Sequence, residues 1–242
     1  KYSLKSKCHR EDMKLIANTK TDEIAACLSN VACSKDSLES EYHREDMRLI
    51  ADAKNDVISQ YLRNVVMDKD SLESEYHEED MKLIADAKND VIANCLSNVA
   101  CRKDSLESEH HREDMKLIAD AKNNVTAYSL RDVACSKYSL KSKCHREDMK
   151  LIANAKTDEI AACLRKEASS KDSLESEYHK EYMKFIANGK TIYNAAEKIY
   201  KEKYRNFSMT FQEKIDAIHQ NAKEYIDGDT TKELDDSVFT LK

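Results

Sequence analysis

Histidine recurs at a fixed interval in this sequence, and imidazole can bind metal or change charge near neutral pH. Six histidines stand 34 residues apart, at His9, His43, His77, His111, His145 and His179. If the intervening segments stack, neighbouring imidazoles lie about 10 Å apart, which is too far to share one ion. The simpler interpretation is a pair within each segment, such as His43 with Asp46. We therefore expect a structural role, with a metal- or pH-responsive array as the alternative.

The eight cysteines do not follow a metal-binding pattern. None has the Cys-x-x-Cys spacing of zinc sites. Where one segment has Cys27, later ones have Tyr61 or Ser129, so the position accepts many side chains and is expected to be a packing position with free thiols. No nucleophile, base and orienting group recur together, and no glycine-rich phosphate loop is present. The sequence therefore predicts no enzyme, no cofactor and no bound metal.

The composition narrows the class of protein further. Proline is absent and only two glycines occur among 242 residues, so turns between β-strands are disfavoured and a mostly helical chain is expected. The formal net charge is -6, and basic residues are interspersed with acidic ones, so no basic stripe is present to bind nucleic acid. No apolar run is long enough to span a bilayer. We expect a protein or peptide partner rather than nucleic acid or membrane.

The 34-residue interval relates most positions of the sequence and defines six repeat units. The units are of two kinds, one with lysine at the positions of Lys141 and Lys143 and the other with glutamate there. Residues 1–28 match residues 137–164 with one difference, which indicates duplication of a block of four units. Such duplication changes the length of a scaffold but not its spacing, which suits a binding surface better than a single active site.

The intracellular location is predicted from weak signals. Free thiols favour a reducing compartment, so we expect a cytoplasmic protein. The first residues fall inside a repeat unit, so the sequence resembles a piece of a longer array. A delivered or secreted parent protein is therefore the alternative.

Each repeat unit is expected to contain an amphipathic second helix. Val57, Ile58, Tyr61, Leu62, Val65 and Val66 fall on one stripe at helical spacing. The apolar stripe upstream points in a different direction, so the chain must turn at Lys54-Asn55. Asn55 is a suitable N-cap for the second helix, and Asp56 then lies favourably in its first turn.

The start of the first helix is open to two interpretations. Asp36, Asp70, Asp104 and Asp172 are each followed by glutamate three residues later, as in a capping box. We prefer this start, which gives two helices of similar length. The competing interpretation continues the second helix through Leu72 and Tyr76 and starts a short helix at Glu79-Asp80, which removes Asp80 and its equivalents from an apolar face.

Stacked helix pairs bury a continuous core that one pair cannot form alone. The sequence therefore predicts an all-α fold, an αα-hairpin solenoid in which 34-residue two-helix repeats form a superhelical array. Residues 1–187 contain about six repeats, and residues 188–242 are expected to form a divergent last helix and capping helices.

The length and two-helix plan resemble the tetratricopeptide repeat, as does the spacing of Leu38, Tyr42 and Ala51, although the tryptophan and closing proline of that consensus are absent. This resemblance implies a protein or peptide ligand in an inner groove. The repeat length and the Glu-Asp-Met-Lys-Leu-Ile-Ala run are also loosely similar to the DNA-reading effectors of plant pathogens. Those effectors approach phosphate through a glycine-bearing loop, whereas this chain has Lys54-Asn55-Asp56, and an aspartate there would repel DNA.

The solvent-facing side of the first helix is the predicted partner-binding surface. Mixed charge usually marks a solvated face, but exchanges between units, such as Arg44 to Glu78, change its charge without altering the apolar stripe. The predicted binding residues are Glu41, Arg44, Arg48, Glu78, Lys82, Arg112, Lys116, Arg146 and Lys150. A second candidate is part of the second helix, where Ser59-Gln60, Ala93-Asn94 and Ala127-Tyr128 vary between units. We expect a non-enzymatic protein-interaction scaffold, with a nucleic-acid-binding array as the alternative.

Overall fold

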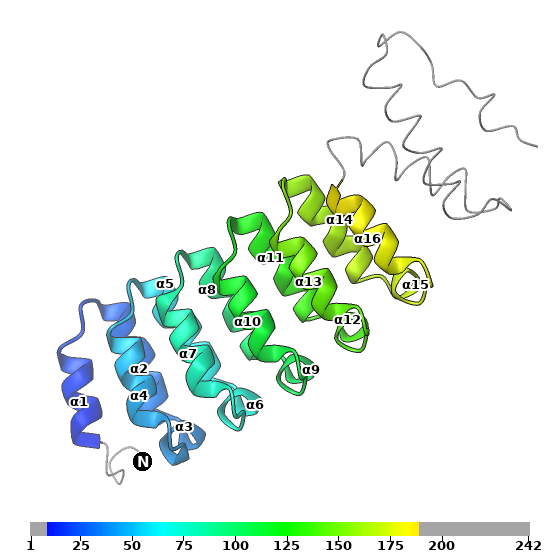
Figure 1. Ribbon diagram of the computed structural model, residues 1–242. Helices are drawn as coiled ribbons and strands as arrows, with labels where there is room; N and C mark the ends of the chain where they lie inside the picture. The colour runs from blue at the N-terminus through cyan, green and yellow to red at the C-terminus, as the bar shows by residue number, and fades with distance from the viewer. Residues whose placement is uncertain (1–8, 189–242) are drawn as a thin grey trace, which may run out of the picture. The chain divides into compact units, whose positions relative to one another are not determined.

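The computed structural model describes residues 9–188, and every regular element in that range is an α-helix. The chain divides into two compact units, Lys1–Glu175 and Ser176–Lys242, which are described separately. The first unit is a solenoid in which three helices recur in each repeat (Figure 1). The predicted all-α repeat array is thereby confirmed. The predicted capping helices after Asn188 lie outside the described residues.

We name the three recurring helices by their place in the repeat. The A helices are α1 (His9–Ala17), α4 (His43–Ala51), α7 (His77–Asp86), α10 (His111–Ala119) and α13 (His145–Ala153). The B helices are α2 (Asp22–Cys33), α5 (Asp56–Met67), α8 (Asp90–Ala100), α11 (Asn124–Ala134) and α14 (Asp158–Ala168). The short helices are α3 (Lys35–Glu39), α6 (Lys69–Leu72), α9 (Lys103–Leu106), α12 (Lys137–Leu140) and α15 (Lys171–Leu174). In the second unit, α16 spans His179–Asn188.

The B helices begin where their N-cap residues predict. The Asn55 side chain accepts a hydrogen bond from the backbone N–H of Ile58, in extended backbone geometry, and Thr21 and Thr157 cap α2 and α14 in the same way. This satisfies one of the N–H groups that the first turn of a helix leaves without a partner. The turn predicted at Lys54-Asn55 is confirmed.

The predicted start of the first helix near Asp36 and Asp70 is wrong, because that segment forms a short third helix between the B helix and the next A helix. Ser34 and Asp68 cap α3 and α6 by accepting from the backbone N–H of the third residue after them, so the cap lies two residues before Asp36 and Asp70. The chain turns again before His43, where α4 begins. The competing interpretation is wrong about the second helix, since α5 ends at Met67 and does not continue through Leu72. Its separate helix near Glu79-Asp80 corresponds to α7, which begins at His77, although Asp80 is buried.

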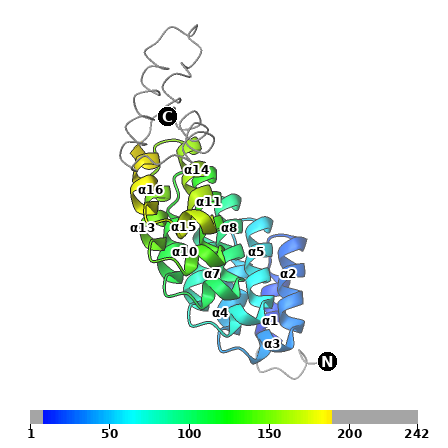
Figure 2. The ribbon, with the colours of Figure 1, turned by 90° about the vertical axis from the view of Figure 1, so that its right-hand side faces the viewer.

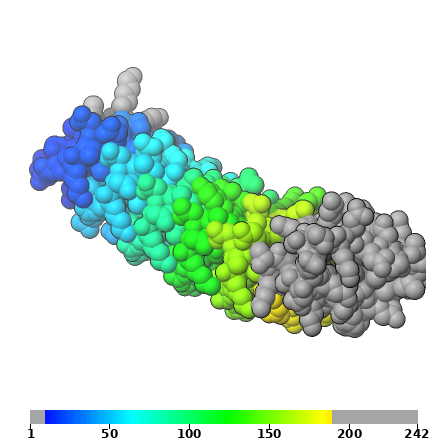
Figure 3. Space-filling view, turned by 90° about the horizontal axis from the view of Figure 1, so that it is seen from above, coloured from blue at the N-terminus to red at the C-terminus, as the bar shows by residue number. Residues whose placement is uncertain are grey.

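The A and B helices of the first unit form two layers with the apolar core between them (Figure 2). Consecutive B helices from α2 to α14 pack on one another, and the repeats of the first unit follow one another as a continuous row (Figure 3). Met47 and Ile50 of α4 and Leu62 and Val65 of α5 have no exposed surface. Val57, predicted on the same stripe, is exposed, because it lies at the start of α5. Burial of these aliphatic side chains is the main stabilising contribution to the stack.

The described helices are all too short or too polar to cross a membrane. This finding concerns residues 9–188 only.

Candidate functional site

Four of the recurring histidines, His43, His77, His111 and His145, lie in the core between consecutive repeats of the first unit. His77 bonds through Nε2 to the carboxylate of Asp46 in the preceding repeat, at 3.1 Å, and through Nδ1 to the hydroxyl of Ser71 in its own repeat, at 3.3 Å. The same Ser–His–Asp arrangement joins Ser37, His43 and Asp12, Ser105, His111 and Asp80, and Ser139, His145 and Asp114. The predicted pair of His43 with Asp46 is wrong, because Asp46 belongs to the histidine of the following repeat.

Serine, histidine and aspartate are also the residues of a hydrolase triad, so the chemistry of this arrangement must be considered. In a triad, the serine hydroxyl bonds to Nε2 and the aspartate to Nδ1, whereas here the two ring nitrogens have exchanged partners. Ser71 and His77 have no exposed surface, so no substrate reaches the hydroxyl. The arrangement is a buried hydrogen-bonded link between repeats, and we call it the Ser–His–Asp link.

Burial sets the electrostatics of this link. Burial raises the pKa of Asp80, because the low-dielectric interior disfavours the carboxylate, and the hydrogen bond from His111 opposes that shift. The His111 ring stacks on Tyr76 with 4.9 Å between ring centroids, and the Arg112 guanidinium lies 5.6 Å from the Tyr76 centroid. Tyr76 therefore covers the outer side of this link, and Arg112 lies over the Tyr76 ring.

The seven cysteines among the described residues are free thiols. Burial raises the pKa of Cys95 to about 11 and that of Cys101 to about 12, so their reactive thiolate forms are scarce at neutral pH. No group of three or more histidine, cysteine or acidic side chains among the described residues is arranged to hold a metal ion.

The predicted binding residues on the A helices lie on one exposed face of the first unit. Glu79 of α7 forms ion pairs with two residues of the next repeat, Arg112 at 2.8 Å and Lys116 at 3.0 Å. Glu113 receives Arg146 and Lys150 in the same way, and Arg44 pairs with Glu11. The hydrogen bond from Lys116 is the main cause that lowers the pKa of Glu79. These cations are therefore exposed but already engaged in ion pairs between repeats.

One junction departs from this pattern. Residue 78 is glutamate where four other repeats have arginine and the last has lysine, and Glu78 pairs with Lys82 on its own helix. Arg48, another predicted residue, lies 3.8 Å from Glu45 one turn earlier on α4. Glu41 does not lie on α4 at all, because the turn before His43 places it beside the short helices.

The second predicted surface was expected to be an exposed part of the B helices, and this is wrong for half of its residues. Ser59, Ala93 and Ala127 are buried, because they face the neighbouring B helix. Of the paired residues, Gln60 is exposed. Variation between units at the buried positions is therefore a packing adjustment rather than a change of binding surface.

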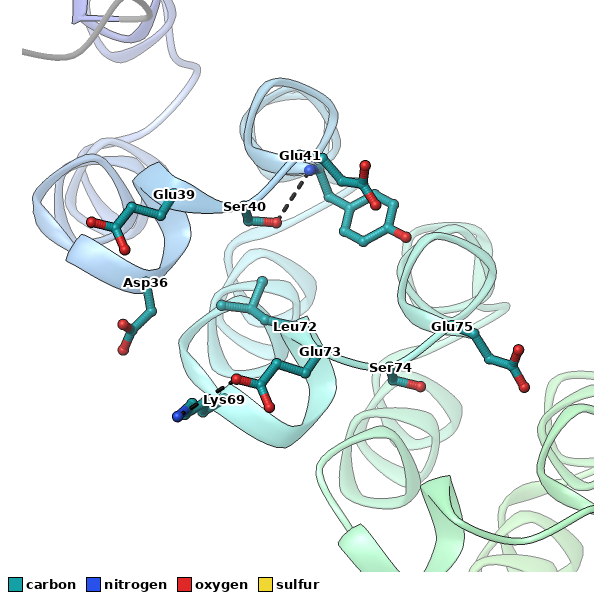
Figure 4. Close-up of a pocket in the computed structure, with 10 residues that line it drawn as sticks. Asp36, Glu39, Ser40, Glu41, Lys69, Leu72, Glu73, Ser74 and Glu75 are labelled. Atoms are coloured by element: carbon teal, nitrogen blue, oxygen red, sulfur yellow. Dashed lines mark hydrogen bonds and ion pairs between the residues drawn. The ribbon is translucent and has the colours of Figure 1, made fainter.

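Open grooves lie between successive short helices, and we call them the edge grooves. The first, between α3 and α6, has a volume of about 610 Å³ (Figure 4). The second, between α6 and α9, has about 290 Å³, and the third, between α9 and α12, has about 500 Å³. The first groove is lined by Asp36, Glu39, Ser40, Glu41, Tyr42, Lys69, Leu72, Glu73, Ser74 and Glu75.

The edge grooves combine an apolar side chain with an acidic rim. Leu72 is half-buried in the first groove, and Leu106 and Leu140 take its place in the second and third. Glu41 and Glu75 are exposed at the first groove, which has five carboxylates and one lysine. The third groove has three carboxylates and two lysines, because Lys141 replaces glutamate. The exchange of glutamate for lysine between repeats is visible in the sequence and could have pointed to this surface. The grooves themselves depend on the turn before each A helix, which the sequence did not predict.

No protein-family model matches the sequence, and no curated protein or solved structure is similar to it at a significant level. The fold and its links define the chain as a helical-repeat solenoid. Its resemblance to the tetratricopeptide repeat in length and plan stays a prediction.

Proposed function

We propose that the protein is a non-enzymatic scaffold that binds a protein or peptide along its first unit. The observation that carries this proposal is the recurrence of the edge grooves at three consecutive junctions, each with a half-buried leucine and a polar rim. A groove that repeats with the array suits a long ligand, because each repeat adds a similar contact. The exposed face of the A helices adjoins these grooves and offers further polar contacts.

Two features support a binding role over catalysis. The buried methionine and isoleucine of the A helices, such as Met47 and Ile50, are the same in every repeat, whereas the exposed positions of Glu41, Glu75 and Lys143 differ in charge. The one arrangement with hydrolase residue types, the Ser–His–Asp link, has no exposed surface at Ser71. Charge thus varies at positions where a partner would meet the protein. We further propose a cytoplasmic location, supported by the free thiols.

The nucleic-acid alternative is less well supported. The first two edge grooves carry more carboxylates than lysines, and phosphate groups would be repelled there. The arginines and lysines on the A helices, such as Arg112 and Lys116, are paired with carboxylates of the neighbouring repeat. A nucleic acid would have to displace these pairs to gain its contacts.

Selection from a displayed library of random peptides, with the full chain as bait, tests the proposed function. We expect enriched sequences whose binding protects the amide hydrogens of residues 69–75 and 103–109 from exchange. A library that yields no binder above background, or binders that protect only the B helices, contradicts a scaffold that acts through the edge grooves.

A further inference from the structure

We propose that the segment bound along the edge grooves is an extended chain with a basic side chain at every third residue. This inference rests on the proposed binding function and names the chemistry of its partner. It depends on the spacing of the grooves, their leucine floors and the change in charge along the row.

The spacing of the grooves selects an extended chain. The B helices of consecutive repeats pack on one another, so the repeats, and the edge grooves with them, recur about 10 Å apart. A chain in the polyproline II conformation rises ~3.1 Å per residue and has three residues per turn, so every third side chain points the same way about 9 Å further on. An α-helix rises ~1.5 Å per residue and would present a side chain to successive grooves only at every seventh residue, so an extended chain contacts the row with fewer residues.

The lining of the grooves selects the side chains. Acidic residues alone would attract any cation, but here the carboxylates surround a half-buried leucine. Lysine and arginine have this combined character, because their apolar stems pack on apolar surface while their charged ends stay at the wet rim. Leu72 would contact such a stem, and Glu41 and Glu75 would face its charge.

The charge of the row limits the length of the bound segment. Glu75 lines both the first and the second groove, so it lies at the centre of the acidic stretch. At the third groove, Lys137 and Lys141 offset the carboxylates, and the exposed Lys143 follows. A basic side chain would gain less attraction there than in the first two grooves. The favourable part of the row therefore covers the first two grooves and ends before Lys141.

Binding of designed peptides to the full chain tests this inference by fluorescence anisotropy at low salt. The probe is a peptide of about nine residues, with arginine at every third position, compared with a peptide of the same composition whose arginines are adjacent. We expect the periodic peptide to bind at least about fivefold more tightly. Equal affinities would mean that the grooves attract cations without ordering a chain, and this would overturn the inference.

Matched variants locate the site. Glu75→Lys introduces the residue that the chain itself has at the equivalent position 143, so the fold tolerates it. We expect this variant to lower the affinity of the periodic peptide by about fivefold or more, because residue 75 lines two grooves. The double variant Asn64→Lys, Asn98→Lys changes the net charge by the same amount on the exposed side of the B helices and introduces the residue found at the equivalent position 166. We expect it to change affinity by less than about twofold.

A gain-of-binding variant completes the test. Lys141→Glu with Lys143→Glu restores the glutamates of the preceding repeat, and we expect it to strengthen binding of a peptide longer by about three residues. Equal weakening by Glu75→Lys and by the double variant Asn64→Lys, Asn98→Lys would overturn the inference, since only net charge would then matter. Library binders that protect the grooves but lack periodic basic residues would overturn it as well, while the scaffold function would stand.

Discussion

At the scale of single residues, the buried Ser–His–Asp link accounts for the strict recurrence of histidine. His77 and Asp46 have almost no exposed surface, and each satisfies the other across the boundary between two repeats. A buried polar group without a partner is costly, so the two side chains depend on one another. This mutual dependence makes the histidine hard to replace without any role in catalysis.

Replacement of His77 by leucine should lower the free energy of unfolding by about 3–5 kcal/mol, because Asp46 would stay buried without its partner. Urea denaturation followed by circular dichroism measures the change. The half-buried His110 serves as a comparison, since Tyr42 and Tyr76 occupy the equivalent sites. His110→Tyr should therefore change stability by less than about 1 kcal/mol. Equal losses for the two variants would contradict the role assigned to the link.

The raised pKa of Asp80 predicts how stability depends on pH at this site. A carboxyl group with a higher pKa in the folded state than its ordinary value of 3.8 binds protons more tightly when folded. Its contribution therefore favours folding more at low pH and is lost as pH rises through the folded-state pKa. In Asp80→Asn, this dependence is absent. As the pH is lowered from about 7 to about 4, the free energy of unfolding of the variant should therefore fall relative to that of the wild type. Urea denaturation at each pH measures this difference.

At the scale of helices, capping side chains fix where the B helices begin, and they also reach the next repeat. Asn55 accepts from the backbone of Ile58 and donates through Nδ2 to the Asp90 carboxylate at 2.9 Å. Asn123 makes the corresponding bonds to Thr126 and Asp158. The same asparagine side chain thus caps the B helix of its own repeat and bonds to the following repeat.

Asn55→Ala should destabilise the protein by about 1 kcal/mol, the usual cost of removing an N-cap. Asn55→Thr introduces the residue that caps α2 and α14 and should recover most of the loss. The midpoint of thermal unfolding measures both variants. If threonine were no better than alanine, the cap would not be the source of the effect.

At the scale of the whole molecule, the array should tolerate changes of whole units only. Asp46 lies 31 residues before His77, and Asp80 lies 31 residues before His111. Deletion of residues 71–104 brings His111 into that relation with Asp46, so the link and the edge groove re-form. We expect a helical, cooperatively unfolding protein, with a smaller dependence of unfolding free energy on urea concentration because less surface is buried.

Deletion of one residue fewer is the control. Without residues 71–103, the A helix that follows is displaced by one residue, about 100° around its axis, and His111 no longer faces Asp46. We expect loss of cooperative unfolding. Equal stability of the two shortened chains would show that aliphatic packing alone sets the register of the repeats.

The sequence by itself determined the features that depend on neighbours along the chain. The 34-residue period, the helical class and the start of α5 at Asn55 follow from apolar spacing and local hydrogen bonds, which a single repeat already contains. Sequence patterns also indicated that Glu39 and Glu41 exchange with lysine in other repeats, although not where those side chains would lie.

The tertiary structure decided the features that arise between repeats. His43 binds Asp12 rather than Asp46, and the turn before α4 moves Glu41 from the A-helix face to the edge grooves. These outcomes depend on which surfaces meet when repeats stack. Stacking buries His43 and Asp46 beside different partners, and the need to satisfy both polar groups overrides the local spacing that suggested a pair within one helix.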